Sequence, residues 1–212
     1  MCSGRVDLEF VLRAFSNGID GVFIGGCRLN ECNYITHGNY DALSNVLLCR
    51  KIMEHIGLNP KRLKIEFMSS GDGILLAEVI NEFCKKVEGI GPLGKSEGID
   101  EKGLKFKLEA VTKLIPYLKL VERERLRVPI KSEEAYNKFF TSDEVNRLIN
   151  ELIIDKLAIS QILLLLGEKP LSTGEMSEIL GLNPSEVSRH MNSSSRHGLV
   201  RYDESRKRYA LA

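Results

Sequence analysis

The stretch Gly21-Val22-Phe23-Ile24-Gly25-Gly26, followed directly by Cys27, decides the fold of the first part of the chain. A short apolar run of this kind is typical of a β-strand that is buried on both faces, as the strands of parallel sheets are. A second strand is predicted over residues 62–68. Strands that alternate with helices of ordinary length predict an α/β fold with a small parallel sheet, flanking helices and right-handed crossovers.

Helical segments are expected on both sides of these strands. The helix predicted over residues 7–17 ends before Gly18, and apolar residues recur at helical spacing over residues 40–56 and 72–87. Cys49 and Cys84 continue the apolar stripes of the last two helices. We therefore expect both thiols to lie in the core and to behave as small hydrophobic side chains.

Composition gives no bias toward one class of partner. The 212 residues include 30 Lys and Arg and 29 Asp and Glu, a net charge of +1, so no global field indicates nucleic acid or a membrane. The longest apolar stretch, residues 159–166, is interrupted by polar side chains and is far shorter than a membrane span. Five cysteines without a preceding secretory signal favour free thiols or metal ligands, and a cytoplasmic location.

Three of the cysteines are placed where they can meet at one edge of the sheet. Cys27 follows the first strand, Cys32 comes five residues later in a polar loop, and Cys2 lies where another strand would end. Iron–sulfur clusters are held by thiolates, normally four for a two-iron cluster. Spacing alone leaves an iron–sulfur cluster, a zinc site without close C-x-x-C pairs, and incidental thiols open. His37 is a candidate fourth ligand, and a solvated loop histidine is the alternative.

Residues 94–154 are predicted to form a linker and a helical segment. The stretch up to Gly103 is rich in glycine and charge, and the amphipathic pattern over residues 104–127 is expected to kink or restart at Pro116. Thr141 and Glu144 have the spacing of a capping box, which predicts the start of a further helix.

Residues 155–212 predict a winged helix-turn-helix domain, with three helices and a β-hairpin. The second helix is expected to open at Ser172 and stop at Gly181, and the third to begin with Asn183 as its N-cap and Pro184 at its first position. If the third helix enters a major groove and the hairpin contacts phosphates, the DNA-binding side chains are Ser185, Ser188, Arg189, Asn192, Arg196, Arg206, Lys207 and Arg208.

The charge of this domain does not decide between DNA and protein as its partner. Residues 183–212 contain six Arg or Lys and three Asp or Glu, so the local excess of three positive charges is compatible with DNA but modest. Winged helices also serve as protein-docking modules, and a fold does not fix a function.

An ordered set of sequence blocks runs through residues 1–93. The blocks are Met1-Cys2-Ser3-Gly4-Arg5, Gly26-Cys27-x4-Cys32-x-Tyr34, Gly38-Asn39-Tyr40, Arg62-Leu63-x-Ile65-Glu66 and Ala77-Glu78-Val79-Ile80-Asn81. Together they resemble the delta (iron–sulfur) subunit of methyl-viologen-reducing hydrogenase. The resemblance implies a 2Fe-2S cluster, and Cys2, Cys27 and Cys32 match family cysteines implicated in binding it.

The resemblance also implies a function and partners. Delta subunits relay electrons from a hydrogenase, a formate dehydrogenase or an NADH-oxidising module to the flavin subunit of heterodisulfide reductase. A subunit of this kind passes electrons and has no catalytic residue of its own. The alternative is a redox-responsive transcriptional regulator that binds DNA through the winged helix.

The chain departs from the family pattern in two places. Family members carry an additional N-terminal strand with a Cys-Cys-x-x-Cys block before the segment that ends at Cys2, and we interpret its absence as a truncated start. The loop between Cys27 and Cys32 reads Arg28-Leu29-Asn30-Glu31, where a His-Pro-Gly-Asp type is more usual. We expect residues 1–93 to form the iron–sulfur domain, followed by the helical segment 94–154 and the winged helix 155–212.

Overall fold

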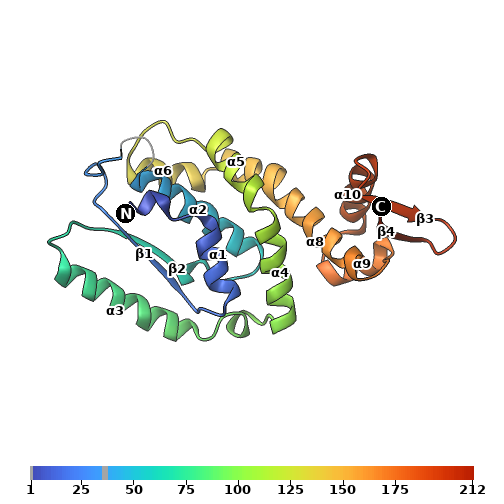
Figure 1. Cartoon of the computed structure of the whole chain (residues 1–212), viewed down its shortest axis with the longest axis horizontal. Coiled ribbons are helices and arrows are strands. Elements are labelled where there is room, and N and C mark those ends of the chain that lie inside the picture. The colour runs from blue at the N-terminus through green and yellow to red at the C-terminus, as the bar shows by residue number, and fades with distance from the viewer. Residues whose placement is uncertain (1, 35–37) are drawn as a thin grey trace. The chain divides into compact units, whose positions relative to one another are not determined.

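A computed structural model describes residues 2–34 and 38–212 of the chain. The chain divides into two compact units, Met1–Leu148 and Ile149–Ala212, and each is described by itself (Figure 1). The predicted domain boundaries at residues 93 and 154 stay predictions. In the part of the chain that the structure describes, no helix is long and apolar enough to cross a membrane.

Two parallel strands form the sheet of the first unit. β1 (Val22–Gly26) pairs with β2 (Leu63–Phe67) along its full length. α1 (Leu8–Ser16) and α2 (Asn39–His55) lie on one side of the strands, and α3 (Gly73–Ile90) lies on the other (Figure 1). This arrangement confirms the predicted α/β class with a small parallel sheet and flanking helices.

β1 is less buried than its apolar sequence predicts. Ile24 is buried, but Gly25 is exposed and Phe23 is only half-buried. α3 buries two side chains, Val79 and Phe83, and the rings of Phe23 and Phe83 lie 5.9 Å apart. The prediction of a strand buried on both faces is therefore wrong, because one helix with two buried side chains shields the second face incompletely.

α3 also corrects the prediction for one of the two helical cysteines. Cys84 on α3 is exposed, so it is not a core thiol. Its neighbours Leu76 and Ile80 are 37% and 36% exposed, because the helix turns only part of its apolar stripe toward the strands. Cys49 on α2 is buried as predicted, and burial raises its pKa to about 12.

Further helices complete the core of the first unit. α4 (Glu101–Lys113) and α5 (Ile115–Arg125) pack against α1, and α6 (Glu133–Thr141) packs against α2. The chain breaks between α4 and α5 at Leu114, with Pro116 in the first turn of α5. The predicted restart at this proline is confirmed, and it is explained by the missing N–H and the fixed φ of the proline ring.

The predicted capping box at Thr141 is wrong. The Thr141 hydroxyl donates to the carbonyl of Asn137 at 2.8 Å and so faces back into α6. Ser142 takes the capping position, because its Oγ accepts from the N–H of Val145 at 3.3 Å. α7 (Asp143–Ile149) begins directly after it.

The second unit is a winged helix. A π-helical turn, η4 (Asn150–Ile154), leads into α8 (Asp155–Glu168), which is followed by α9 (Thr173–Leu180) and α10 (Pro184–Arg196). The antiparallel hairpin of β3 (Val200–Asp203) and β4 (Arg208–Leu211) closes the fold. Its core residues are Ile162, Leu166, Leu171, Met176, Val187, Met191 and Val200.

The helix boundaries of this unit follow their cap residues. Ser172 and Glu175 form a capping box at the start of α9, and Asn183 and Glu186 form one at the start of α10. Gly181 ends α9 in the left-handed region with a φ of 65°. The predicted boundaries are confirmed here because each cap satisfies backbone groups that lie within three residues of it.

Arg62 is fully buried in the first unit, where it joins several segments. Its Nε and Nη2 donate to the carboxylate of Glu97 at 2.7 and 3.1 Å. Its Nη1 donates to the carbonyls of Asp20 and Gly91 at 3.0 and 2.8 Å, and Nη2 reaches the carbonyl of Pro92 at 3.3 Å. The guanidinium of Arg62, at the start of β2, thus joins Asp20 before β1 and Gly91 after α3 to Glu97.

Glu97 is held in its ionised form by the same contacts. Burial opposes its ionisation, but hydrogen bonds from Arg62 and from the N–H groups of Asn59 and Gly94 hold the pKa of Glu97 below its usual value. A carboxylate with a depressed pKa stabilises the fold above its unfolded-state pKa. That stabilisation is lost as the pH falls through the folded-state pKa.

We expect Glu97→Gln to lower the free energy of unfolding by about 3 kcal/mol at neutral pH, because it leaves Arg62 buried without a counter-charge. Urea unfolding measures this loss. Protonated Glu97 resembles Gln, so the difference from the native protein should shrink below about pH 4. Glu88→Gln, on the exposed side of α3, is the control and should change little. A deficit of constant size from neutral to acidic pH would contradict this role for Glu97.

Candidate functional site

Cys2, Cys27 and Cys32 come together beside the carboxyl end of β1. Cys27 directly follows β1, and Cys2 is the N-cap of a short 3-10 helix, η1 (Ser3–Arg5). The Sγ atoms of Cys2 and Cys32 lie 3.6 Å apart. The Cys27 thiol is close enough to Cys32 and Cys2 for both to raise its pKa. The structure therefore brings the three predicted site residues into one group, which we call the thiol cluster.

Two glycines allow the segments of the thiol cluster to approach one another. A Cβ at Gly38 would lie 2.6 Å from the Sγ of Cys32 and would clash with the carbonyl oxygen of Tyr34. A Cβ at Gly4 would clash with the carbonyl oxygen of Gly38. Backbone this close to backbone and sulfur leaves no room for a side chain, so η1 and the start of α2 can meet around Cys32 only with glycine at both positions.

Asn39, the first residue of α2, holds the loop that follows β1. Its side chain is buried, and its Nδ2 donates to the carbonyls of Cys27 and Arg28 at 2.9 and 2.8 Å. The same nitrogen lies 3.6 Å from the Sγ of Cys27. The residue pattern alone gives Asn39 no role. It is a polar residue between Gly38 and the helix predicted over residues 40–56.

Two further contacts fix the same loop. The Tyr40 hydroxyl lies 3.0 Å from Oδ1 of Asn30. Arg28 donates to the carboxylate of Asp72 at 2.7 Å, and hydrogen bonds from Ser69 and then from Arg28 lower the pKa of Asp72. Arg28 is one of the residues that depart from the usual family loop. Here it adds an ion pair between the loop and the start of α3.

The thiols of the cluster differ in acidity. Desolvation and the neighbouring sulfurs of Cys32 and Cys2 raise the pKa of Cys27. The N–H of Tyr34 does most to lower the pKa of Cys32, and the N–H of Asn39 at the start of α2 adds to it. Donors at a helix N-terminus stabilise a thiolate in this way. Cys32 is therefore the readier of the two to ionise near neutral pH.

The thiol cluster offers the ligand type that iron–sulfur centres use, and one of its spacings is compatible with a tetrahedral metal ion. Two thiolates on one tetrahedral metal ion, each with a bond of about 2.3 Å, are separated by about 3.8 Å. The sulfurs of Cys2 and Cys32 are 3.6 Å apart. Within residues 2–34 and 38–212, however, no three His, Cys, Asp or Glu side chains surround a single metal position. A two-iron cluster distributes four thiolates over two irons, so it does not require three at one point. His37 lies outside the described residues.

In the reduced, metal-free protein we expect iodoacetamide to modify Cys32 before Cys27, because the lower pKa of Cys32 gives it the larger thiolate fraction. Cys49, which is buried and has a pKa of about 12, should react only after unfolding. Peptide mass spectrometry over a time course near neutral pH measures the order. Faster modification of Cys27 than of Cys32 would contradict the electrostatics of the cluster.

The predicted DNA-binding residues lie on one side of α10 and on the hairpin of the second unit. Val187 and Met191 face the core and are fully buried. Arg206 and Lys207 are exposed in the turn of the hairpin. The predicted side chains of α10 are all exposed, namely Ser185, Ser188, Arg189, Asn192 and Arg196, and the exposed carboxylate of Glu186 lies on the same helix.

Three of the predicted cations have a carboxylate partner inside the second unit, and one of these pairs, Arg206 with Asp203, is long at 3.9 Å. Arg208 is half-buried and donates to Glu175 at 2.8 Å, so it fastens β4 to the start of α9. Arg189 is exposed and donates to Asp155 of α8 at 3.0 Å. Arg208 is therefore better explained as an anchor of the hairpin than as a free phosphate contact.

Two protein families match this chain. The family described as methyl-viologen-reducing hydrogenase, delta subunit, matches residues 1–91. The family described as bacterial regulatory protein, arsR family, matches residues 160–202. The first match contains the whole thiol cluster, and the second runs from α8 into β3.

Several known proteins are similar to the first part of the chain. One subunit of the ferredoxin/F(420)H(2)-dependent CoB-CoM heterodisulfide reductase of Methanosarcina acetivorans is 48% identical over 94 residues, which are 44% of this chain and 12% of that protein. The iron-sulfur subunit of the F420-non-reducing hydrogenase of Archaeoglobus profundus is 43% identical over 91 residues, 43% of this chain and 66% of that protein. The vhc iron-sulfur subunit of the F420-non-reducing hydrogenase of Methanococcus voltae is 36% identical over 104 residues, 48% of this chain and 72% of that protein. The chain thus spans about an eighth of the reductase protein and about two thirds of the hydrogenase proteins.

Proposed function

The chain belongs to the methyl-viologen-reducing hydrogenase delta-subunit family, and from this premise we propose that it is an iron–sulfur electron-transfer subunit. It relays electrons from a hydrogenase, a formate dehydrogenase or an NADH-oxidising module to the flavin subunit of a heterodisulfide reductase-type complex. The observation that carries this proposal is the meeting of Cys2, Cys27 and Cys32 beside the end of β1. The names of its relatives, subunits of hydrogenases and of heterodisulfide reductases, support it.

Cys2, Cys27 and Cys32 would hold a 2Fe-2S cluster, which supplies one-electron transfer when it is bound. These thiols account for three of the four ligands that such a cluster normally takes. Cys27 is exposed, and so is much of the loop that follows it. An electron carrier needs such a surface position, because its partners must approach the centre closely.

The residues around the thiol cluster would orient the ligands and stabilise their charge. Asn39 fixes the backbone of Cys27 and Arg28 through their carbonyls and points the same amide toward the Cys27 sulfur. The N–H groups of Tyr34 and Asn39 face the sulfur of Cys32. Hydrogen-bond donors to ligating sulfur tune the reduction potential of an iron–sulfur centre.

Anaerobic reconstitution with ferrous iron and sulfide tests this assignment. We expect the native protein to gain a visible absorption spectrum and about two irons per chain. Cys27→Ser and Cys32→Ser should lose most of the bound iron, because a hydroxyl replaces a thiolate ligand. Cys84→Ser should keep it, since Cys84 is exposed on α3 and takes no part in the thiol cluster. An iron-free native protein, or equal iron loss in all of the variants, would overturn the proposal.

The second candidate function is DNA binding by the winged helix, as part of a redox-responsive transcriptional regulator. The match of residues 160–202 to the arsR family favours it. The exposed polar side of α10 and the cations Arg206 and Lys207 in the hairpin turn are consistent with it. Docking to a protein surface is the competing role for the same elements.

Binding of a random-sequence DNA duplex at two salt concentrations separates these roles. We expect Arg196→Glu and Arg206→Glu each to weaken binding and to lower the salt slope by about one counterion, because each removes a phosphate contact. Lys138→Glu, an exposed position on α6 in the first unit, is the matched control. Fluorescence anisotropy gives the affinities. If the native protein does not bind, or binds without salt dependence, the winged helix is a protein-docking module.

A further inference from the structure

β2 has an unpaired edge in the first unit. Within the described residues β2 pairs only with β1, and the N–H of Met68 donates to the carbonyl of Gly26 at 2.9 Å. Backbone groups alternate in direction along a strand, so the groups of Leu63, Ile65 and Phe67 point away from β1. This is the outer edge of the sheet, and an edge of this kind is a template for a further strand.

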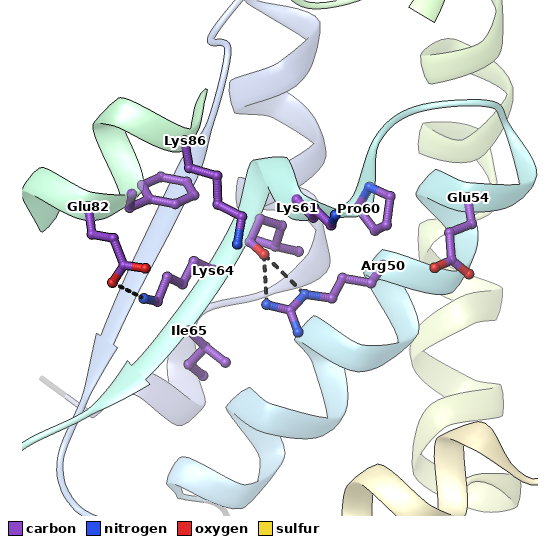
Figure 2. A pocket seen from close by; sticks show the side chains of 10 residues that line it. Arg50, Glu54, Pro60, Lys61, Lys64, Ile65, Glu82 and Lys86 are labelled. Carbon is purple, nitrogen blue, oxygen red and sulfur yellow. Dashed lines mark hydrogen bonds and ion pairs between the residues drawn. The ribbon is translucent and has the colours of Figure 1, made fainter. Parts of the chain in front are cut away.

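One part of this edge is already satisfied by the protein itself. Arg50 on α2 donates to the carbonyl of Leu63 through Nε at 3.0 Å and Nη2 at 2.8 Å (Figure 2). The N–H of Leu63 donates to the carbonyl of Pro60. For the outward groups of Ile65 and Phe67, residues 2–34 and 38–212 provide no hydrogen-bonding partner. The outer edge of β2 is therefore hydrogen-bonded at Leu63, and its backbone groups at Ile65 and Phe67 are unpaired among the described residues.

A cavity of about 420 Å³ adjoins this edge, between α2 and α3. Its charged lining consists of four cations and two carboxylates, so it carries an excess of two positive charges. These residues are Arg50, Lys61, Lys64, Lys86, Glu54 and Glu82 (Figure 2). The leucine, isoleucine and phenylalanine side chains of the strand and of α3 supply its apolar part.

The cations of the cavity are weakly neutralised. Lys64 lies 3.5 Å from Glu66 and 3.9 Å from Glu82, which are long ion pairs. Lys61 and Lys86 have no carboxylate within 4.0 Å among the described residues. Ion pairs as long and as exposed as those of Lys64 contribute little free energy. The ammonium groups of Lys61, Lys64 and Lys86 therefore remain available to an anionic partner.

We infer that this edge binds an acidic peptide segment of a partner protein, added to β2 as a further strand. The unpaired groups of Ile65 and Phe67 would hydrogen-bond the backbone of the segment, and Lys61 and Lys86 would receive its carboxylates. Backbone pairing gives such a complex its affinity, and side-chain pockets give it specificity. The inference concerns an edge that is independent of the thiol cluster and does not require the proposed iron–sulfur centre.

A second copy of the chain brings no complementary charge to the cavity, because the cavity of each copy carries the same excess of two positive charges. An acidic segment meets these groups with opposite charge.

Fluorescence anisotropy with the intact protein and a labelled peptide of alternating Glu and Val tests this inference. We expect saturable binding that weakens with salt, and no binding of the corresponding peptide of alternating Lys and Val. Methylation of alternate peptide nitrogens should weaken binding at least about tenfold, because it removes the donors that pair with an edge strand. Equal affinity of the methylated and unmethylated peptides would overturn strand addition.

Variants of the cavity locate the site. Lys61→Glu and Lys86→Glu should each weaken peptide binding by about tenfold, since each replaces an attraction by a repulsion. Lys85→Glu is the matched control, because Lys85 is the neighbour of Lys86 on α3 and does not line the cavity. Circular dichroism and the Tm report whether each variant is folded. Equal losses in all three variants would place the peptide elsewhere and overturn the inference.

Inorganic phosphate distinguishes a peptide edge from a simple anion site. We expect millimolar phosphate to compete only to the extent that an equal ionic strength of sodium chloride does. If phosphate displaces the peptide completely while sodium chloride does not, the cavity is an anion site and the strand-addition proposal is wrong. Absence of saturable binding to the native protein would also refute it.

Discussion

The fully buried guanidinium of Arg62 is the constraint on which the first unit depends. A buried charge must have a counter-charge and hydrogen bonds for its remaining donors, since an unpaired one costs several kcal/mol. Arg62 finds both in Glu97 and in the carbonyls of Asp20, Gly91 and Pro92. Satisfying one side chain therefore fixes the beginnings of both parallel strands against the end of α3. The sheet has only two strands in the part of the chain that the structure describes, and this anchor compensates for what a small sheet cannot provide by pairing alone.

The opposite end of the strands is organised differently, and this difference suits a site. The thiol cluster lies beyond the last residue of β1, where Asn39 and closely packed glycine backbone replace a buried ion pair. Polar side chains and backbone N–H groups fix the loop while leaving Cys27 exposed. The buried ion pair thus lies at one end of the sheet. The other end presents exposed sulfur on a loop that is held at several points, as is usual for functional residues on a scaffold.

Sequence predicted those parts of the structure that depend on neighbours along the chain. Ser172 and Asn183 mark helix starts through bonds to residues two or three positions away, and cysteines after a strand end are expected to meet at a sheet edge. One error is local: Ser142, not its neighbour Thr141, caps the following helix. The other errors concern distant contacts. The exposure of Cys84 depends on how little of α3 is covered, and the role of Asn39 depends on the path of a loop twelve residues earlier in the chain. The helical spacing of apolar residues gives the direction of a stripe but not what packs against it.

Net charge likewise does not predict where on the protein a partner binds. The near balance of 30 basic and 29 acidic residues excludes a field over the whole chain, but it does not describe any one surface. Among the described residues, Lys61 and Lys86 remain without close carboxylates beside the edge of β2, whereas Arg208, which sequence grouped with the free cations, is bound by Glu175. Whether a cation can meet a partner depends on the carboxylates that the fold places near it. For a nearly neutral chain, interaction surfaces must therefore be derived from individual ion pairs and not from composition.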